Sequence, residues 1–286
     1  MRHFILLTGA SSGIGEATCK KLTESNYDVL ACVRSQADAD RLEVSFGERL
    51  HPLIMDVTDE NSIAKAKREA EVIIGEDSLV AIVNNAGIAI SGAVLYIPIE
   101  EWKKQLDVNV LGVVRSIQAF FPLLKSINYT PNQHPRRIIN ISSISGLFAS
   151  PFVGPYASSK YALEALSDSL RRELYMYDIQ VVLIEPGNII TPLWKKVRES
   201  SSYSGPEYDS IVTFKDRVID NNLLQSLPVE KVSDRILDCI RDKKVRNRYL
   251  IKAGAWKFKL VRMLPSSWVD RMIRKKLIEK SGIRPF

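Results

Sequence analysis

A glycine-spaced turn follows the first apolar run of the chain and restricts the folds that the chain can adopt. Residues 2–8 read as a buried strand, the turn Thr8-Gly9-Ala10-Ser11-Ser12-Gly13-Ile14-Gly15 follows at once, and an amphipathic run occupies 16–25. Strand, glycine turn and helix in this order open a βαβ unit. The glycines let the backbone approach a phosphate, whose charge the free N–H groups at the helix start favour. The spacing is GxxxGxG rather than GxGxxG, so it matches the mechanism of a dinucleotide-binding turn and not its usual pattern.

Five further apolar runs alternate with amphipathic stretches along the chain. We predict strands at 28–34, 50–55, 79–83, 136–141 and 180–184, and helices at 59–74, at about 100–125 and from Tyr156 onward. Such alternation is typical of a parallel sheet that binds ligands at the carboxyl ends of its strands. The sequence therefore predicts an α/β protein with a single-domain, Rossmann-type, doubly wound parallel sheet and helices on both faces. We expect a dinucleotide-binding and catalytic domain at 1–252 and a C-terminal helical extension at 253–286.

Cysteine and histidine usage argues against disulfides and metal sites. Neither residue type shows the spacing of a metal site or of a disulfide framework; the residues concerned are Cys19, Cys32, Cys239, His3, His51 and His134. We therefore expect no metal ion and a reducing, cytoplasmic environment.

Neither of two apolar segments predicts a leader or a membrane span. The apolar part of residues 1–8 is too short for a signal peptide and runs straight into the glycine turn. Residues 79–97 approach the length of a membrane-spanning helix but contain Asn84, Asn85 and two glycines. We interpret them as a buried strand followed by a loop.

The residue that ends the second strand indicates which dinucleotide is bound. In this kind of unit an acidic residue there holds the ribose hydroxyls of NAD, and a basic residue accommodates the 2′-phosphate of NADP. Here the strand ends in Arg34, while Asp38 and Asp40 lie further on in the next predicted helix. The charge complementarity favours NADP.

Tyr156 and Lys160 stand one helical turn apart at the start of an amphipathic run, just after Pro155. Residues i and i+4 of a helix share a face, so the phenol and the ammonium can point into one cleft. A neighbouring ammonium and the positive end of the helix dipole both lower the pKa of a phenol. The pair predicts a proton donor or acceptor, although Tyr-x-x-x-Lys also occurs by chance on many helices.

Other polar residues collect at the predicted strand ends and on one helix. Asn84-Asn85-Ala86-Gly87 follows the fourth strand and Ser142-Ser143 the fifth. Asn109 interrupts an apolar helix, where it is either a local kink or a site residue. After the sixth strand, residues 188–226 are irregular and rich in Ser, Tyr and Gly, which is typical of a lid over the substrate.

Together these motifs resemble the short-chain dehydrogenase/reductase superfamily, and most closely its branch of 17β-hydroxysteroid and retinol dehydrogenases. The resemblance covers about residues 3–250. It implies that Tyr156 is the catalytic acid or base and that Lys160 lowers its pKa and holds the nicotinamide ribose. It further implies that Ser142 hydrogen-bonds the substrate oxygen and that Asn109 holds a water between Lys160 and solvent. The implied cofactor contacts are Gly9, Ser11, Ser12, Gly13 and Ile14 at the pyrophosphate and ribose, Arg34 at the 2′-phosphate, Asp56 and Val57 at adenine, Asn84, Ala86 and Gly87 at the adenosine ribose, and Pro186, Gly187, Ile189 and Thr191 at the nicotinamide.

The resemblance implies an NADP-dependent oxidoreductase that interconverts an alcohol and a ketone or aldehyde on an apolar substrate such as a steroid, a retinoid or a long-chain carbonyl. Tyr156 would transfer the proton that accompanies the hydride. Two alternatives stay open: a 3-oxoacyl thioester reductase, and a dinucleotide-sensing binding protein without activity. The family commonly forms dimers or tetramers, so we expect a homodimer or a homotetramer.

The basic character of the chain resides in its C-terminal segment. Residues 241–286 hold 15 lysines and arginines against three acids, although the whole chain has a net charge of only +7. Aromatic and aliphatic residues alternate with these charges over 253–280, which predicts two short amphipathic helices separated at Pro265. Their apolar face either contacts a membrane peripherally or packs on the lid or a second subunit. Nucleic-acid binding is not expected, because no recognition motif accompanies the charge.

Overall fold

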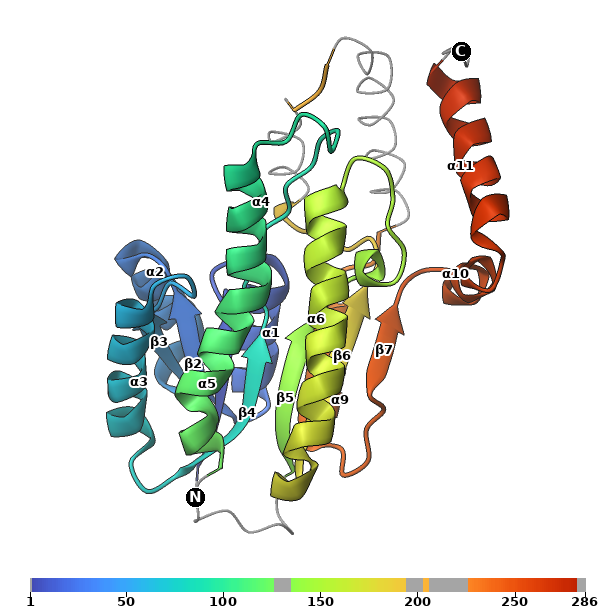
Figure 1. Ribbon diagram of the computed structural model, residues 1–286. Coiled ribbons are helices and arrows are strands. Elements are labelled where there is room, and N and C mark those ends of the chain that lie inside the picture. Colours follow the sequence, from blue (N-terminus) through green and yellow to red (C-terminus); the bar gives the residue numbers. More distant parts are fainter. Residues whose placement is uncertain (1, 126–134, 194–202, 206–225, 282–286) are drawn as a thin grey trace.

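Seven parallel strands form one sheet with helices on both of its faces (Figure 1). The computed structural model describes residues 2–125, 135–193, 203–205 and 226–281. The strand order is β3-β2-β1-β4-β5-β6-β7. This is the predicted doubly wound α/β fold, and the order reverses direction between β1 and β4. In sheets of this kind ligands bind outside the carboxyl ends of the strands at that reversal.

Six of the seven strands match the predicted apolar runs to within two residues at each end. The strands of the sheet are β1 (His3–Thr8), β2 (Asp28–Val33), β3 (Leu50–Ile54), β4 (Ser78–Asn84), β5 (Arg136–Ile141), β6 (Ile179–Pro186) and β7 (Arg248–Ile251). The edge strand β7 was not predicted, because its four residues are only half-buried and form no apolar run. It pairs with the carboxyl half of β6, from Leu183 to Pro186.

The α-helices stand between the strands in the chain and after the last strand. The bounds are α1 (Gly13–Glu24), α2 (Gln36–Phe46), α3 (Glu60–Ile74), α4 (Ile99–Leu106), α5 (Gly112–Leu124), α6 (Gly154–Glu173), α9 (Glu230–Arg241), α10 (Ala255–Arg262) and α11 (Ser266–Ser281). Short 3-10 turns occupy Gly47–Arg49, Ile144–Gly146 and Leu174–Tyr177, and a π-helical turn occupies Asp107–Leu111.

Two apolar cores lie on the two faces of the sheet, as expected when every strand is covered on both sides. In β1, Ile5 and Leu7 belong to the core beneath α1, α2 and α9, whereas Phe4 and Leu6 belong to the core beneath α3, α5 and α6. All four side chains are fully buried. The alternation explains why the first strand reads as a continuous apolar run.

The predicted long helix is present as α4, the π-helical turn and α5 in succession. By length and composition alone residues Ile99–Leu124 could cross a membrane. In this fold the same helix lies along the sheet, with Phe120 and Leu124 buried in the core that α3 and α6 share. We therefore interpret its apolar character as core packing.

The C-terminal extension consists of the two predicted helices. Ile251 ends β7, α10 begins at Ala255, and Pro265 separates α10 from α11. In Figure 1, α11 stands apart from the sheet and from the helices that cover it.

Candidate active site

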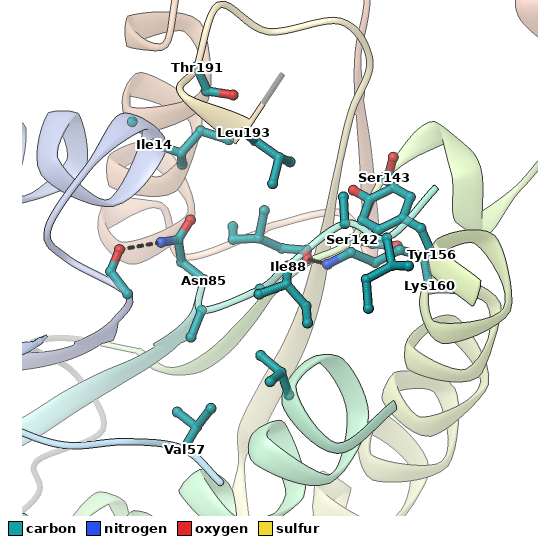
Figure 2. A pocket seen from close by; sticks show the side chains of 18 of the residues that line it. Ile14, Val57, Asn85, Ile88, Ser142, Ser143, Tyr156, Lys160, Thr191 and Leu193 are labelled. Carbon is teal, nitrogen blue, oxygen red and sulfur yellow. Dashed lines mark hydrogen bonds between the residues drawn. The ribbon is translucent and has the colours of Figure 1, made fainter. Parts of the chain in front are cut away.

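A cavity of about 890 Å³ opens at the carboxyl edge of the sheet. Figure 2 shows part of its lining from close by. The segments that follow β1 to β6 all contribute to it, so the strand reversal and the cavity coincide. The predicted site residues in its lining are Gly9, Ser11, Ser12, Gly13, Ile14, Arg34, Asp56, Val57, Ala86, Gly87, Ser142, Tyr156, Lys160, Pro186, Gly187, Ile189 and Thr191. Asn84 and Asn109 lie outside the lining.

The glycine turn brings the start of α1 against the end of β4. Gly9 has φ +65°, and a Cβ on it would lie 2.8 Å from the Cα of Ala86. A Cβ on Gly15 would overlap the carbonyl oxygen of Gly9. Ser12, the residue before α1, makes no side-chain cap, so the first N–H groups of this helix keep their capacity for a ligand. A phosphate group fits such a helix start.

Arg34 follows β2 and lies exposed at the edge of the cavity. Within the described part of the chain its guanidinium has no assigned hydrogen bond or ion pair. Arg41 differs, because its guanidinium donates to a Glu16 carboxylate oxygen at 2.6 Å and to the Ser11 carbonyl at 2.6 Å. Arg41 thus braces the glycine turn, whereas Arg34 is available to an anionic ligand.

The turn after β3 supplies Asp56 and Val57. The Asp56 carboxylate accepts hydrogen bonds from the Thr58 backbone N–H at 2.9 Å and from the Thr58 hydroxyl at 2.7 Å. Val57 packs on Gly112, where a Cβ would lie 2.7 Å from the Val57 Cγ2. The turn is therefore fixed by its own contacts, with both residues in the cavity lining.

The structure places Asn85, rather than Asn84, in the cavity lining. The Asn84 amide is buried in the sheet and donates to the Asn140 side chain at 2.8 Å. Asn85 donates from its side chain to the backbone carbonyls of Thr8 at 3.1 Å and Gly9 at 2.9 Å. Successive residues of a strand point in opposite directions, so Asn84 points toward Asn140 in the sheet while the next residue, Asn85, points to the cavity.

Asn109 lies in the π-helical turn and hydrogen-bonds the segment after β4, which lines the cavity. Its side-chain oxygen accepts from the Ile88 N–H at 2.9 Å, and its amide donates to the Ile88 carbonyl at 3.0 Å and the Ser159 hydroxyl at 3.0 Å. Gln105, which the sequence did not single out, adds bonds at 2.8 Å to the Ile90 N–H and the Ile88 carbonyl. The two amides together fix the segment after β4.

A side-chain hydrogen bond connects Ser143 to Tyr156. Burial raises the pKa of Tyr156, and a side-chain hydrogen bond with Ser143 lowers it in part. In Figure 2, Ser143 lies beside the Tyr156 ring. The Ser142 hydroxyl, which we had predicted for this place, is buried without a hydrogen-bond partner in the structure. Both serines line the cavity, and the role predicted for Ser142 toward the substrate oxygen stays a prediction.

Lys160 lies below Tyr156 on the same face of α6. Its ammonium donates to the Ile141 carbonyl at 2.7 Å and stands 5.8 Å from the centroid of the Tyr156 ring. Burial lowers the pKa of Lys160 to about 8. Burial, the largest influence on Tyr156, raises the pKa of the phenol, and the lowering of that pKa by Lys160 stays a prediction.

The segment after β6 closes the cavity on the side of the glycine turn. Gly187 donates its N–H to the Ile251 carbonyl at 2.8 Å, and Ile190 donates to the Leu227 carbonyl at 3.1 Å. Thr191 lies against the turn, since a Cβ on Gly13 would be 3.3 Å from the Thr191 Cγ2. Of the predicted lid at 188–226, the ranges 194–202 and 206–225 lie outside the described residues.

The lining fits a nicotinamide adenine dinucleotide. The uncapped start of α1 suits a pyrophosphate, Arg34 suits a further phosphate, and Tyr156 belongs to the same cavity lining. Residues 3–202 match the sequence profile described as short chain dehydrogenase. The chain belongs to the short-chain dehydrogenase/reductase family. Its members are NAD(P)-dependent oxidoreductases, and the resemblance seen in the sequence is thereby confirmed.

Known members of the family align with nearly the whole chain. An NADPH-dependent 3-dehydrocapnine reductase of Ornithobacterium rhinotracheale is 36% identical over 96% of this chain and 97% of that protein. Human retinol dehydrogenase 5 is 30% identical over 94% of this chain and 87% of its own. The crystal structure of a short-chain dehydrogenase from Streptomyces avermitilis has a TM-score of 0.75 and 24% identity, covering 98% of this chain and 96% of that one. The last comparison supports the fold.

Proposed function

We propose that this short-chain dehydrogenase/reductase reduces a ketone on a long apolar substrate with NADPH, and that Tyr156 donates the proton. The observation that carries the proposal is the buried Tyr156 phenol at the cavity, with its pKa raised by burial and Ser143 beside it. A phenol with a raised pKa holds its proton at neutral pH. It is thus in the state needed to donate that proton to a carbonyl oxygen.

The side chains of the cavity have separate roles at the carbonyl group of the substrate. A dinucleotide held by Arg34 and the start of α1 would supply the hydride to the carbonyl carbon. Tyr156 and Ser143 both hydrogen-bond the carbonyl oxygen, so that its growing negative charge meets donors that are already in place. The Tyr156 proton then passes to that oxygen and completes the alcohol.

Lys160 restores the proton on Tyr156 in this proposal. Its pKa of about 8 lets the ammonium exchange protons near neutral pH, and it lies 5.8 Å from the centre of the Tyr156 ring. Asn109 acts on the site indirectly. Its bond to Ser159, the neighbour of Lys160, and its bonds to Ile88 hold two walls of the cavity at a fixed separation.

Arg34 supports NADPH as the cofactor rather than NADH. It is an exposed guanidinium at the end of β2 with no assigned partner in the described chain, and a guanidinium binds a phosphate through two parallel hydrogen bonds. The relative of Ornithobacterium rhinotracheale, an NADPH-dependent reductase, gives the same indication for this chain.

Apolar side chains around the carboxyl edge support an apolar substrate. Several large hydrophobic side chains there are exposed, namely Val94, Leu95, Tyr96, Ile99 and Ile190. Val94 lies against the start of α6, since a Cβ on Gly154 would be 2.7 Å from its Cγ2. Tyr156 is in the same first turn of α6, so an apolar chain that leaves the reacting carbon meets apolar surface.

A substrate panel followed by NADPH absorbance tests the proposal. It includes 3-dehydrocapnine, a steroid ketone, retinal, a 3-oxoacyl thioester and a short water-soluble ketone. We expect the long-chain ketones to give kcat/KM at least tenfold above the short ketone, and NADPH to be preferred over NADH. Preference for the acyl thioester would favour the 3-oxoacyl reductase instead. Tight NADPH binding without turnover of any compound would favour a dinucleotide sensor.

A further inference from the structure

The C-terminal extension exposes an apolar surface that no other described segment covers. None of the residues of α10 is buried. The exposed fractions of the large apolar side chains in α10, in α11 and between them are 63% for Trp256, 55% for Leu260, 81% for Met263, 59% for Trp268 and 47% for Met272. A contiguous exposed apolar patch on a soluble domain usually marks an interaction site.

Helix α10 has two apolar faces, and only one of them contacts the sheet domain. Phe258 is half-buried and packs edge-on against Phe148, with ring centroids 6.3 Å apart. Trp256, Leu260 and Met263 follow one another at i, i+4 and i+7, so they share a different face of the helix. Docking through Phe258 therefore leaves the Trp256 face directed away from the domain.

Helix α11 continues the exposed apolar surface. Trp268 and Met272 lie one turn apart on the same face, Arg271 lies at the border of that face, and Arg274 lies on another face of the helix. Figure 1 shows α11 running beyond the carboxyl ends of the strands and apart from the other helices. Its apolar face thus has access to a large partner.

The charge of this surface indicates an anionic partner. Within 255–275 the basic residues are Lys257, Lys259, Arg262, Arg271, Arg274 and Lys275, and the acidic residue is Asp270. Each basic side chain near an anionic bilayer raises the affinity about fivefold. Tryptophan adds to this, because its amphipathic ring is stable at the level of the lipid headgroups.

The extension is attached at the same edge of the sheet as the cavity. Phe148, which holds α10, lies between Ser143 and Tyr156 in the chain. Lys259 and Arg262 of α10 lower the pKa of Glu185, which burial first raises, so they lie close to the carboxyl end of β6. A partner bound to α10 therefore lies near the segment 144–153, of which Ser145 and Val153 line the cavity.

We propose that residues 255–275 bind the surface of an anionic lipid bilayer, with Trp256 and Trp268 at headgroup level. The entrance of the cavity then faces the membrane. A second copy of the chain fits this surface less well, because a two-fold contact would bring the same basic residues face to face. Binding to lipid does not depend on the proposed reaction, and it is measured without substrate.

Vesicle flotation of the full-length protein tests the apolar part of the proposal. We expect binding to vesicles of 70% phosphatidylcholine and 30% phosphatidylglycerol, and at least tenfold weaker binding to phosphatidylcholine alone. The double variant Trp256→Ala/Trp268→Ala should lose at least tenfold in affinity for the anionic vesicles. Tyr175→Ala/Met176→Ala is the matched control, because both side chains are exposed but lie before β6, at the opposite edge of the sheet.

A second pair of variants separates the local charge from the net charge. Arg271→Glu/Arg274→Glu and Lys20→Glu/Lys65→Glu change the net charge equally, and all four side chains are exposed. We expect the first pair to abolish binding at 0.15 M salt and the second to reduce it less than threefold. All variants should keep the wild-type thermal unfolding temperature, which excludes misfolding as the cause.

Three outcomes would overturn the proposal. One is that the wild-type protein does not float with anionic vesicles. Another is that the tryptophan variant binds them as tightly as the Tyr175→Ala/Met176→Ala control. The third is a concentration-dependent dimer in sedimentation velocity that Trp256→Ala/Trp268→Ala dissociates, with no lipid binding, which would assign the surface to a second copy.

Discussion

The side chain of Ser143 is hydrogen-bonded to Tyr156 and partly offsets the rise in pKa that burial causes in this phenol. The contact joins the turn after β5 to the first turn of α6. Ser143 also accepts a hydrogen bond from the Ser145 N–H at 3.1 Å, which fixes its position at the start of a 3-10 turn. A donor held in this way is suited to bind a carbonyl oxygen together with Tyr156.

Adjacent serine variants test this assignment. Ser143→Ala should lower kcat by about 100-fold, the usual cost of removing one donor to a developing oxyanion. Ser142→Ala should lower kcat less than about threefold, because removal of a buried hydroxyl without a partner costs little. Steady-state kinetics with the preferred ketone measure both, and a larger loss for Ser142→Ala would return the role to the residue predicted from the sequence.

Arg34 offers a test of cofactor choice. Arg34→Asp should weaken NADPH binding by about 10- to 100-fold through loss of a charged hydrogen bond and added repulsion of the phosphate. NADH binding should change less than threefold. Arg172→Asp, an exposed site at the far end of α6, makes the same change in net charge and serves as the control. Fluorescence titration of the wild type and both variants with each cofactor gives the six dissociation constants, and an unchanged NADPH affinity in Arg34→Asp would exclude the role.

Glu185 should make the free energy of unfolding depend on pH near neutrality. Burial and the nearby Glu164 raise its pKa from 4.5 to about 7 in the folded protein. The unfolded chain therefore loses this proton first, and the stability falls as the pH rises from about 4.5 and reaches its lowest level above about 7. The full effect corresponds to about 3 kcal/mol.

Glu185→Gln should remove that dependence. Relative to the wild type, the variant should gain free energy of unfolding as the pH rises from 5 to 8. Asp168→Asn provides a control, because the bond to Arg248 holds the pKa of Asp168 below its usual range, so that its stabilisation is lost only as the pH falls below about 4 and the pH profile of this variant between 5 and 8 should parallel that of the wild type. Urea unfolding at both pH values measures the difference, and parallel pH profiles for wild type and Glu185→Gln would contradict the assignment.

The sequence was sufficient for most of the sheet because its buried strands are continuous apolar runs. It failed at β7, where Arg248 to Ile251 are half-buried and become a strand only by pairing with β6. That pairing depends on contacts far apart in the chain, which local periodicity does not contain.

Local pattern could not separate neighbouring polar residues at the strand ends. Asn85 lines the cavity while Asn84 is buried in the sheet, and of two serines that both line it Ser143 is the one hydrogen-bonded to Tyr156, because the backbone direction at each strand end sets where the side chains point. Asn109 was correctly marked as unusual in its helix. Its bonds to Ile88 became visible only when the π-helical turn was placed against the segment after β4.

The most direct test of the account is the turnover of Tyr156→Phe with NADPH and the preferred ketone, measured beside its NADPH affinity. The account predicts a fall in kcat of about 1,000-fold, because the proton donor is lost while the ring remains. The NADPH dissociation constant should stay within threefold of the wild type. A Tyr156→Phe enzyme that keeps kcat within tenfold of the wild type would show that Tyr156 is not the proton donor.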